Sequence, residues 1–242
     1  MISFVCYFHS SRISNLRQTL RLLFKREKSI GEVILVCNDR TDEIFEGCNL
    51  QNMEMNEYNK PKMCNFGVSK ASEELVVLLD SDRILPRGYF DKLGLELKGG
   101  QFASCRRMFN IASECSDEQI ESEDFKFTEE ERSMTWEVRR KNLFSGNTAF
   151  FKRDYLDAGG MDESFVGYGF ADNDMTLNVM NKGMTPVWSD SVEYHLYHEK
   201  SVMEDGGLVG FAKYRKTSQS NLNRFLKKWK LKELMKFYGP IV

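Results

Sequence analysis

The sequence predicts an α/β fold in which a mixed, mostly parallel sheet is flanked by helices. Three short runs carry this prediction, because Ile2–Phe8, Val33–Cys37 and Leu75–Leu79 are almost entirely apolar. Strands that are apolar on both faces are typical of parallel sheets covered by helices. The composition, 41% hydrophobic and 29% charged over 242 residues, suits one globular α/β domain.

Two helices are predicted between these three strands. After the first strand, Ser10 and Ser11 offer a helix cap, and residues 16–24 carry Leu and Phe at helical spacing. The second helix begins at Pro61, since proline is well tolerated in the first turn. Residues 48–57 show no clear pattern.

The second half of the chain is predicted to add further strands and one helix. We expect a strand over Phe102–Met108, renewed order over Leu143–Lys152, a helix over Ala171–Asn181, and closing strands at Val187–Trp188 and Val192–His198. Residues 113–141 differ, because they hold ten acids against five bases and few aliphatic side chains. This composition predicts an exposed, partly mobile insertion that could act as a lid.

The end of the chain is basic. Residues 213–236 hold nine Lys or Arg and one acid, a charge of +8, whereas the whole chain carries -2. Asn221–Phe237 has the pattern of an amphipathic helix, with apolar residues on one face and lysines on the other. We therefore divide the chain into a domain, residues 1–212, and a basic helical extension, residues 213–242. The extension could dock on the domain or contact an anionic membrane through residues 213–236; contact with nucleic acid is less favoured.

The cellular compartment is predicted from the N-terminus, the cysteines and the hydropathy. No run is long and apolar enough to predict a transmembrane helix, and the first residues resemble a strand rather than a signal peptide. The six cysteines form no C-x-x-C pair, which argues against a zinc ribbon and favours a reducing compartment. We expect a cytoplasmic protein, with peripheral contact at the inner membrane face as an option.

The tripeptide Asp80-Ser81-Asp82 directly follows the third predicted strand. Ligands of open α/β sheets bind beyond the carboxyl ends of the strands, and Asn38–Asp42 follows the second strand in the same way. Two carboxylates one residue apart can hold a hard divalent cation, which in turn can bind a diphosphate. The alternative is a solvated turn, because Asp and Ser are common turn residues.

Five motifs follow one another in a recognisable order. They are YNKPKMCNFG at 58–67, DSD at 80–82, SGNTAFFK at 145–152, GGMDESFVGYGFADND at 159–174 and YHLYH at 194–198. Over residues 2–200 this order resembles the inverting glycosyltransferases of family 2, of the chondroitin-polymerase type, and the β-1,4-galactosyltransferases. The resemblance implies a GT-A-type fold and Mn²⁺- or Mg²⁺-dependent transfer of a hexose or N-acetylhexosamine. The sugar would pass from a UDP-sugar to an acceptor hydroxyl, with inversion, on a glycan or glycolipid in polysaccharide biosynthesis.

The same resemblance implies roles for individual residues. Asp39 would accept a hydrogen bond from the uracil base, Asp80 would contact the ribose, and Asp82, in a DXD motif, would bind the metal. The remaining residues of the nucleotide-sugar site would be Tyr58, Lys60, Asn65, Ser81 and Gly146.

The later motifs imply the catalytic base, the acceptor site and the remaining metal ligands. Asp172 would remove the proton of the acceptor hydroxyl, and Tyr168 and Asp174 would bind the acceptor. An imidazole beside carboxylates suits Mn²⁺, and His198 is the favoured ligand, with His195 as an alternative or second ligand. Their spacing of three places them on opposite faces of a strand, unless the strand has already turned.

The motif around the base also departs from the galactosyltransferase pattern. Ala171 stands where that pattern has Glu, and Val166, Tyr168 and Phe170 replace two tryptophans and a glycine. Three other functions therefore stay open: a nucleotide-sugar-binding module with weak or no catalysis, a glycosyltransferase acting on modified nucleic acid bases, and a nucleotidyltransferase. The last has little support, since no Gly-rich basic loop follows the first strand.

Overall fold

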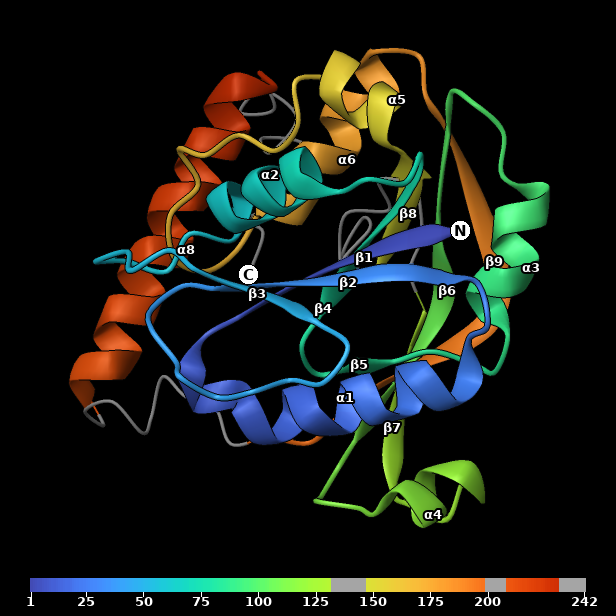
Figure 1. Cartoon of the computed structure of the whole chain (residues 1–242). Coiled ribbons are helices and arrows are strands. Elements are labelled where there is room, and N and C mark those ends of the chain that lie inside the picture. Colours follow the sequence, from blue (N-terminus) through green and yellow to red (C-terminus); the bar gives the residue numbers. More distant parts are fainter. Residues whose placement is uncertain (132–146, 199–207, 231–242) are drawn as a thin grey trace.

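The computed structural model describes residues 1–131, 147–198 and 208–230, and its strands form one mixed sheet with helices on both faces (Figure 1). The predicted α/β class is confirmed. The strands are β1 (Ile2–Phe8), β2 (Ile30–Cys37), β3 (Asn49–Asn52), β4 (Leu75–Asp80), β5 (Arg83–Ile84), β6 (Gln101–Ile111), β7 (Phe127–Glu131), β8 (Thr148–Phe151) and β9 (Thr185–His195). The α-helices are α1 (Ile13–Arg26), α2 (Lys60–Lys70), α3 (Tyr89–Glu96), α4 (Asp117–Glu121), α5 (Lys152–Asp157), α6 (Ala171–Asn181) and α8 (Leu208–Lys228).

The first half of the sheet is parallel. β1 pairs with β2 and β4, and β3 continues the order beyond β2. β1 is buried along its whole length because α1 covers one face of the sheet and α2 the other (Figure 1). α2 lies so close to β1 that a Cβ at Gly67 would be 2.2 Å from Cγ1 of Val5, which explains the glycine there.

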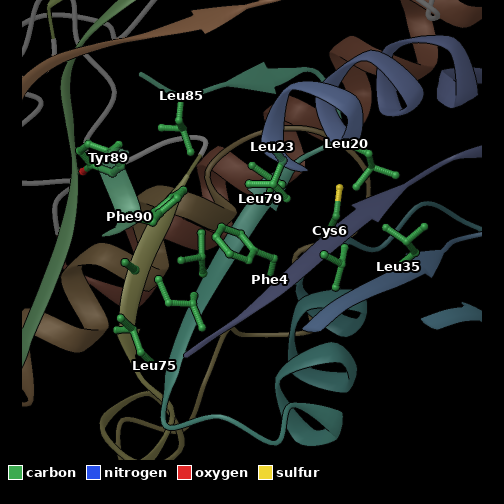
Figure 2. Close-up of a cluster of buried hydrophobic side chains, with 14 of the residues drawn as sticks. Phe4, Cys6, Leu20, Leu23, Leu35, Leu75, Leu79, Leu85, Tyr89 and Phe90 are labelled. Carbon is green, nitrogen blue, oxygen red and sulfur yellow. The ribbon is translucent and has the colours of Figure 1, made fainter. Parts of the chain in front are cut away.

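The main hydrophobic core lies between the sheet and α1 (Figure 2). Phe4, Leu35 and Leu79 of the strands pack with Leu20 and Leu23 of α1 in this core. Each such side chain contributes about 1.5–3 kcal/mol when it is fully buried. This core fixes the strands whose carboxyl ends carry the predicted site.

The second half of the sheet is mixed. β8 lies antiparallel to both β4 and β6, whereas β6 and β9 are parallel. The two closing strands predicted near the C-terminal end are one strand, β9, with an irregular register opposite Cys105 and Arg107 of β6. β9 ends at His195, so His198 lies beyond the strand. The patternless residues 48–57 contain β3, a short polar strand at the edge of the sheet.

Within the predicted insertion, residues 113–131 form regular structure. Ser116 and Gln119 form a capping box for α4, Ile120 is buried, and β7 pairs with β6. Arginines of other elements neutralise the acids, as when Arg26 contacts Glu121 at 2.9 Å. These residues are part of the folded domain, and the rest of the predicted insertion, 132–141, lies outside the described residues.

The basic extension also differs from its prediction. α8 begins at Leu208, well before Asn221, and ends at Lys228; residues 231–242 lie outside the described residues. Its apolar face docks on the domain, where Phe225 and Leu226 are buried against Phe165. The apolar face of α8 therefore packs against the domain. Contact of its lysine face with a membrane stays a prediction. Among the described helices none has the length and apolarity to cross a bilayer.

Candidate active site

The predicted site residues gather where β1, β2 and β4 end. Parallel strands bring their carboxyl ends to one edge of the sheet, and Tyr7, Asp39 and Asp80 lie at or just beyond these ends. α2 begins beside them with Lys60, after Asn59 has capped its first turn through the backbone N–H of Lys62. The first turn of α6 adds Asp172.

Asp82, His195 and His198 form a cluster that could hold a metal ion. Their ligand atoms all lie within 4.8 Å of one another. Oδ2 of Asp82 is 3.1 Å from Nε2 of His198 and 3.5 Å from Nε2 of His195. The chain turns after β9, so both histidines reach the same carboxylate, and both predicted ligands meet in the fold.

The surroundings orient this cluster and keep Asp82 charged. Burial opposes the charge of Asp82, but hydrogen bonds from both histidines and the nearby Arg83 outweigh it and hold its pKa well below the usual value. Nδ1 of His195 lies 2.9 Å from Oδ1 of Asn110 on β6, a contact of the kind that orients metal-binding imidazoles.

Arg83 is a residue of this site that the sequence analysis missed. Its Nε lies 3.5 Å from Asp80 and 3.7 Å from Asp82, and its Nη1 lies 3.5 Å from the fully buried Glu193. The buried guanidinium of Arg83 thus offsets the negative charge of three carboxylates, those of Asp80, Asp82 and Glu193. A basic residue directly after the DSD motif was a signal that could have revealed it, whereas nothing in the local sequence marks Glu193.

Lys60 joins two of the predicted site residues. Its Nζ is 3.2 Å from Oδ1 of Asp80 and 2.7 Å from Oδ1 of Asp172. The hydroxyl of Tyr7 also donates to Asp80. Burial opposes the charge of Asp80, but Lys60 and Arg83 outweigh it and lower its pKa.

Asp172 has the opposite shift. Burial raises its pKa, and the attraction of Lys60 offsets this only in part. A carboxylate with a raised pKa has a greater affinity for protons, which is what a general base requires.

Asp39 is held at the end of β2 by the segment that follows β1. The backbone N–H and the hydroxyl of Ser10 donate to its two carboxylate oxygens, and Nε2 of His9 lies 3.6 Å away. Burial opposes its charge, but the hydrogen bonds from Ser10 and Cys37 outweigh it and lower its pKa. The side chain is therefore an oriented hydrogen-bond acceptor just beyond the end of β2.

Two of the predicted ligand-binding residues serve the fold instead. Oδ1 of Asn65 accepts from Tyr155 and from the backbone of Met161, and its Nδ2 donates to Met161 and Glu163. Asp174 is 1% exposed, and its carboxylate binds Lys228 and Trp229, each at 2.8 Å. Asn65 therefore holds the turn before residue 164, and Asp174 anchors the end of α8.

The other predicted residues are placed as follows. Ser81 is buried, and its carbonyl accepts from Thr19 of α1, so its main chain supports the loop. Tyr58 is partly exposed and binds the N–H of Gly167 through its carbonyl, at 2.7 Å. Tyr168 is 58% exposed. Gly146 lies outside the described residues.

Comparison with known proteins finds one matching family and several solved structures of similar fold. The family described as "N-terminal domain of galactosyltransferase" matches residues 126–199, the segment that contains Asp172 and both histidines. No match to this chain was found among curated protein sequences.

Solved structures match over most of the chain. GalNAc-T7 with UDP, GalNAc and Mn²⁺ matches at a TM-score of 0.63 and 15% identity, over 83% of this chain and 44% of the other. TarS 1-349 of S. aureus matches at 0.58 and 14%, over 84% and 61%. A mutant β-1,4-galactosyltransferase 7 of Drosophila with manganese, UDP-Gal and xylobiose matches at 0.53 and 12%, over 83% and 72%. The chain has the GT-A fold of glycosyltransferases, and it spans less than two thirds of the GalNAc-T7 and TarS chains.

Proposed function

We propose that this chain is a metal-dependent glycosyltransferase that moves a hexose or N-acetylhexosamine from a UDP-sugar to an acceptor hydroxyl with inversion. The observation that carries the proposal is the meeting of Asp82, His195 and His198, next to the Lys60 bridge between Asp80 and Asp172. Similar structures support the donor, since they were solved with UDP and Mn²⁺, with UDP-GlcNAc, and with UDP-Gal and manganese.

The residues present fit a divalent transition metal. One carboxylate oxygen and two imidazole nitrogens are a donor set that suits Mn²⁺ better than Mg²⁺, which prefers oxygen ligands. When bound, such an ion supplies positive charge that stabilises the diphosphate leaving group. Asp82, His195 and His198 would hold it.

The nucleotide would lie across the ends of β2 and β4. In the proposed arrangement, the oriented carboxylate of Asp39 accepts from the uracil N–H, and Asp80 accepts from a ribose hydroxyl. The ring of Tyr58 lies on the uridine side, and Lys60 supplies a cation beside the phosphates. The buried network around Arg83 holds Asp80 and Asp82 in place for these contacts.

Asp172 would act as the general base. The acceptor hydroxyl loses its proton to Asp172 as its oxygen attacks the anomeric carbon from the face opposite UDP. The bond to UDP breaks with its electron pair going to the diphosphate. Because the attack comes from the opposite face, the anomeric configuration inverts. We place the acceptor, a glycan or the glycan part of a glycolipid, beside the exposed Tyr168.

The test measures donor binding and transfer separately. UDP affinity is measured by calorimetry with Mn²⁺ and with EDTA, and UDP release is measured over a panel of UDP-sugars with glycoside acceptors. We expect Asp172→Asn to lower turnover by about 10²–10⁴-fold and to leave UDP affinity within about twofold of the wild type. The matched control, Asp157→Asn, alters an exposed carboxylate of α5 and should behave as the wild type.

Three results would contradict the proposal. Absence of UDP binding with Mn²⁺ would show that the chain has no donor site for UDP-sugars. Turnover retained in Asp172→Asn would show that Asp172 is not the general base. Binding of UDP-sugars without turnover on any acceptor would favour the nucleotide-sugar-binding module.

A further inference from the structure

The helix α8, which the sequence presents as a separate tail, contacts the segment that carries the proposed base. Its residues from Thr217 to the end of the helix lie against residues 162–174, the segment that leads into α6. Phe165 is fully buried there, with Phe225 and Leu226 2% and 3% exposed. The ring of Phe170 also lies 5.5 Å from that of Phe225.

The polar contacts of α8 fall on the backbone of the loop 166–170. Nδ2 of the buried Asn221 donates to the carbonyl of Val166 and to the carbonyl of Tyr168, each at 3.0 Å. These carbonyls lie outside the strands and helices of the structure. Each such hydrogen bond contributes about 0.5–1.5 kcal/mol, so this one amide stabilises the loop at two points.

The two glycines of this loop show how closely α8 approaches it. Both have positive φ, 76° at Gly167 and 92° at Gly169. A Cβ at Gly167 would lie 2.9 Å from Cβ of Thr217, and one at Gly169 would lie 3.3 Å from Oγ of Ser218. The loop therefore packs with its bare backbone against side chains of α8.

The same loop is held from the nucleotide side. The N–H of Gly167 donates to the carbonyl of Tyr58 at 2.7 Å, two residues before Lys60. Lys228 joins the two ends of the segment, since it contacts Asp162 at 3.0 Å and Asp174 at 2.8 Å. The loop 166–170 is thus clamped between Tyr58 on one side and α8 on the other. Tyr168, within this loop, is exposed.

We infer that α8 is part of the acceptor site and that Asn221 is its positioning residue. By holding the carbonyls of Val166 and Tyr168, Asn221 fixes the loop against which the acceptor sugar binds. It also fixes the approach to Asp172. The acceptor role rests on the proposed function, whereas the clamp itself does not.

The test compares Asn221→Asp with the matched control Asn223→Asp, which alters an exposed residue on the same helix. Asn221→Ser removes both donors without adding a buried charge, and it serves if the aspartate variant does not fold. Hydrogen exchange of residues 164–171 reports the clamp. The Kd for UDP with Mn²⁺ reports the donor site, and KM and kcat for p-nitrophenyl glycosides report the acceptor.

We expect the Asn221 variants to exchange in residues 164–171 at least about 10-fold faster, as loss of one to two hydrogen bonds predicts. KM for the glycoside should rise about 10-fold, with a smaller change in kcat, while the Kd for UDP stays within about twofold of the wild type. The inference would be overturned if the Asn221 variants had the same hydrogen-exchange rates and the same KM as Asn223→Asp. It would also be overturned if their affinity for UDP fell by the same factor as their affinity for the acceptor. If the wild type binds no UDP, the proposed function fails, and the exchange rates still decide whether Asn221 clamps the loop.

Discussion

Replacing Lys60 with methionine should change both the pH dependence and the stability of the protein, because its ammonium group joins two partly buried carboxylates. Nζ lies 2.7 Å from Asp172 and 3.2 Å from Asp80, and the Lys60 side chain is only 13% exposed. Methionine keeps the length and apolar stem of lysine without its charge. Asp80 keeps its contacts with Tyr7 and Arg83, whereas Asp172 loses the contact that lowers its pKa.

The size of the effect follows from the loss of one close cation. A nearby opposite charge lowers the pKa of a carboxyl group, so the pKa of Asp172, already raised by burial, should rise further in Lys60→Met. Removing one partner of a fully buried ion pair costs about 3–5 kcal/mol of unfolding free energy, which is the upper bound for this partly buried one. For a chain of this size the upper bound corresponds to roughly 6–20 °C in Tm.

The sign of the pH effect is fixed by which form of Asp172 is active. The base must be deprotonated, so a higher pKa moves the acid limb of the kcat/KM profile to higher pH. A raised folded-state pKa also means that protonation stabilises the folded protein, so the Tm deficit of Lys60→Met should shrink as the pH falls below the new pKa.

The assay measures kcat/KM and Tm at several pH values for the wild type, Lys60→Met and Lys60→Arg. Lys62→Met is the matched control, since Lys62 is an exposed neighbour in the same helix. Arginine should restore the acid limb because it restores the charge. An acid limb that stays in place in Lys60→Met, with activity left to measure, would refute the coupling between Lys60 and Asp172.

Two further predictions concern the metal cluster and the folding of the domain. Asn110→Leu removes the partner of His195 Nδ1 and should weaken Mn²⁺ binding about 10–100-fold, measured by electron paramagnetic resonance titration; unchanged affinity would show that this contact does not orient a ligand. Burial raises the pKa of Glu27 to about 7, although its carboxylate accepts backbone N–H groups of α3. Its folded pKa exceeds the unfolded value of 4.5, so the unfolding free energy should fall, by at most about 3 kcal/mol, as the pH rises from about 4.5 to 7. Glu27→Gln should flatten this dependence in denaturant titrations, and an equal slope in both proteins would contradict the assignment.

The parts of the site that were predictable are those attached to strand ends. Asp39 and Asp80 follow apolar runs, and parallel pairing places such residues at one edge of the sheet without further information. The sequence does not bring His195 and His198 together, because a strand alone would have placed them on opposite faces. Their meeting depends on the pairing of β5 with β9 and on the turn after His195.

The roles of Asn65 and Asp174 could not be predicted in the same way. Both belong to motifs that resemble ligand-binding segments, yet their partners are residues of the chain itself. Asp174 is bound by Lys228 and Trp229, more than fifty residues away, and Asn65 is bound by a turn almost a hundred residues away. A motif states which polar atoms are present, but the side chains that reach them are set by packing.

The sequence by itself determined the α/β class, the three parallel strands and the edge at which the acidic residues gather. These features follow from hydrophobic periodicity and chain direction, which are local properties. Only the tertiary structure decided that Arg83 and Glu193 support the DSD motif, that residues 113–131 form α4 and β7, and that the basic helix holds the loop before Asp172. Those outcomes depend on which buried charges and carbonyls find a partner, and the partners come from segments far apart in the chain.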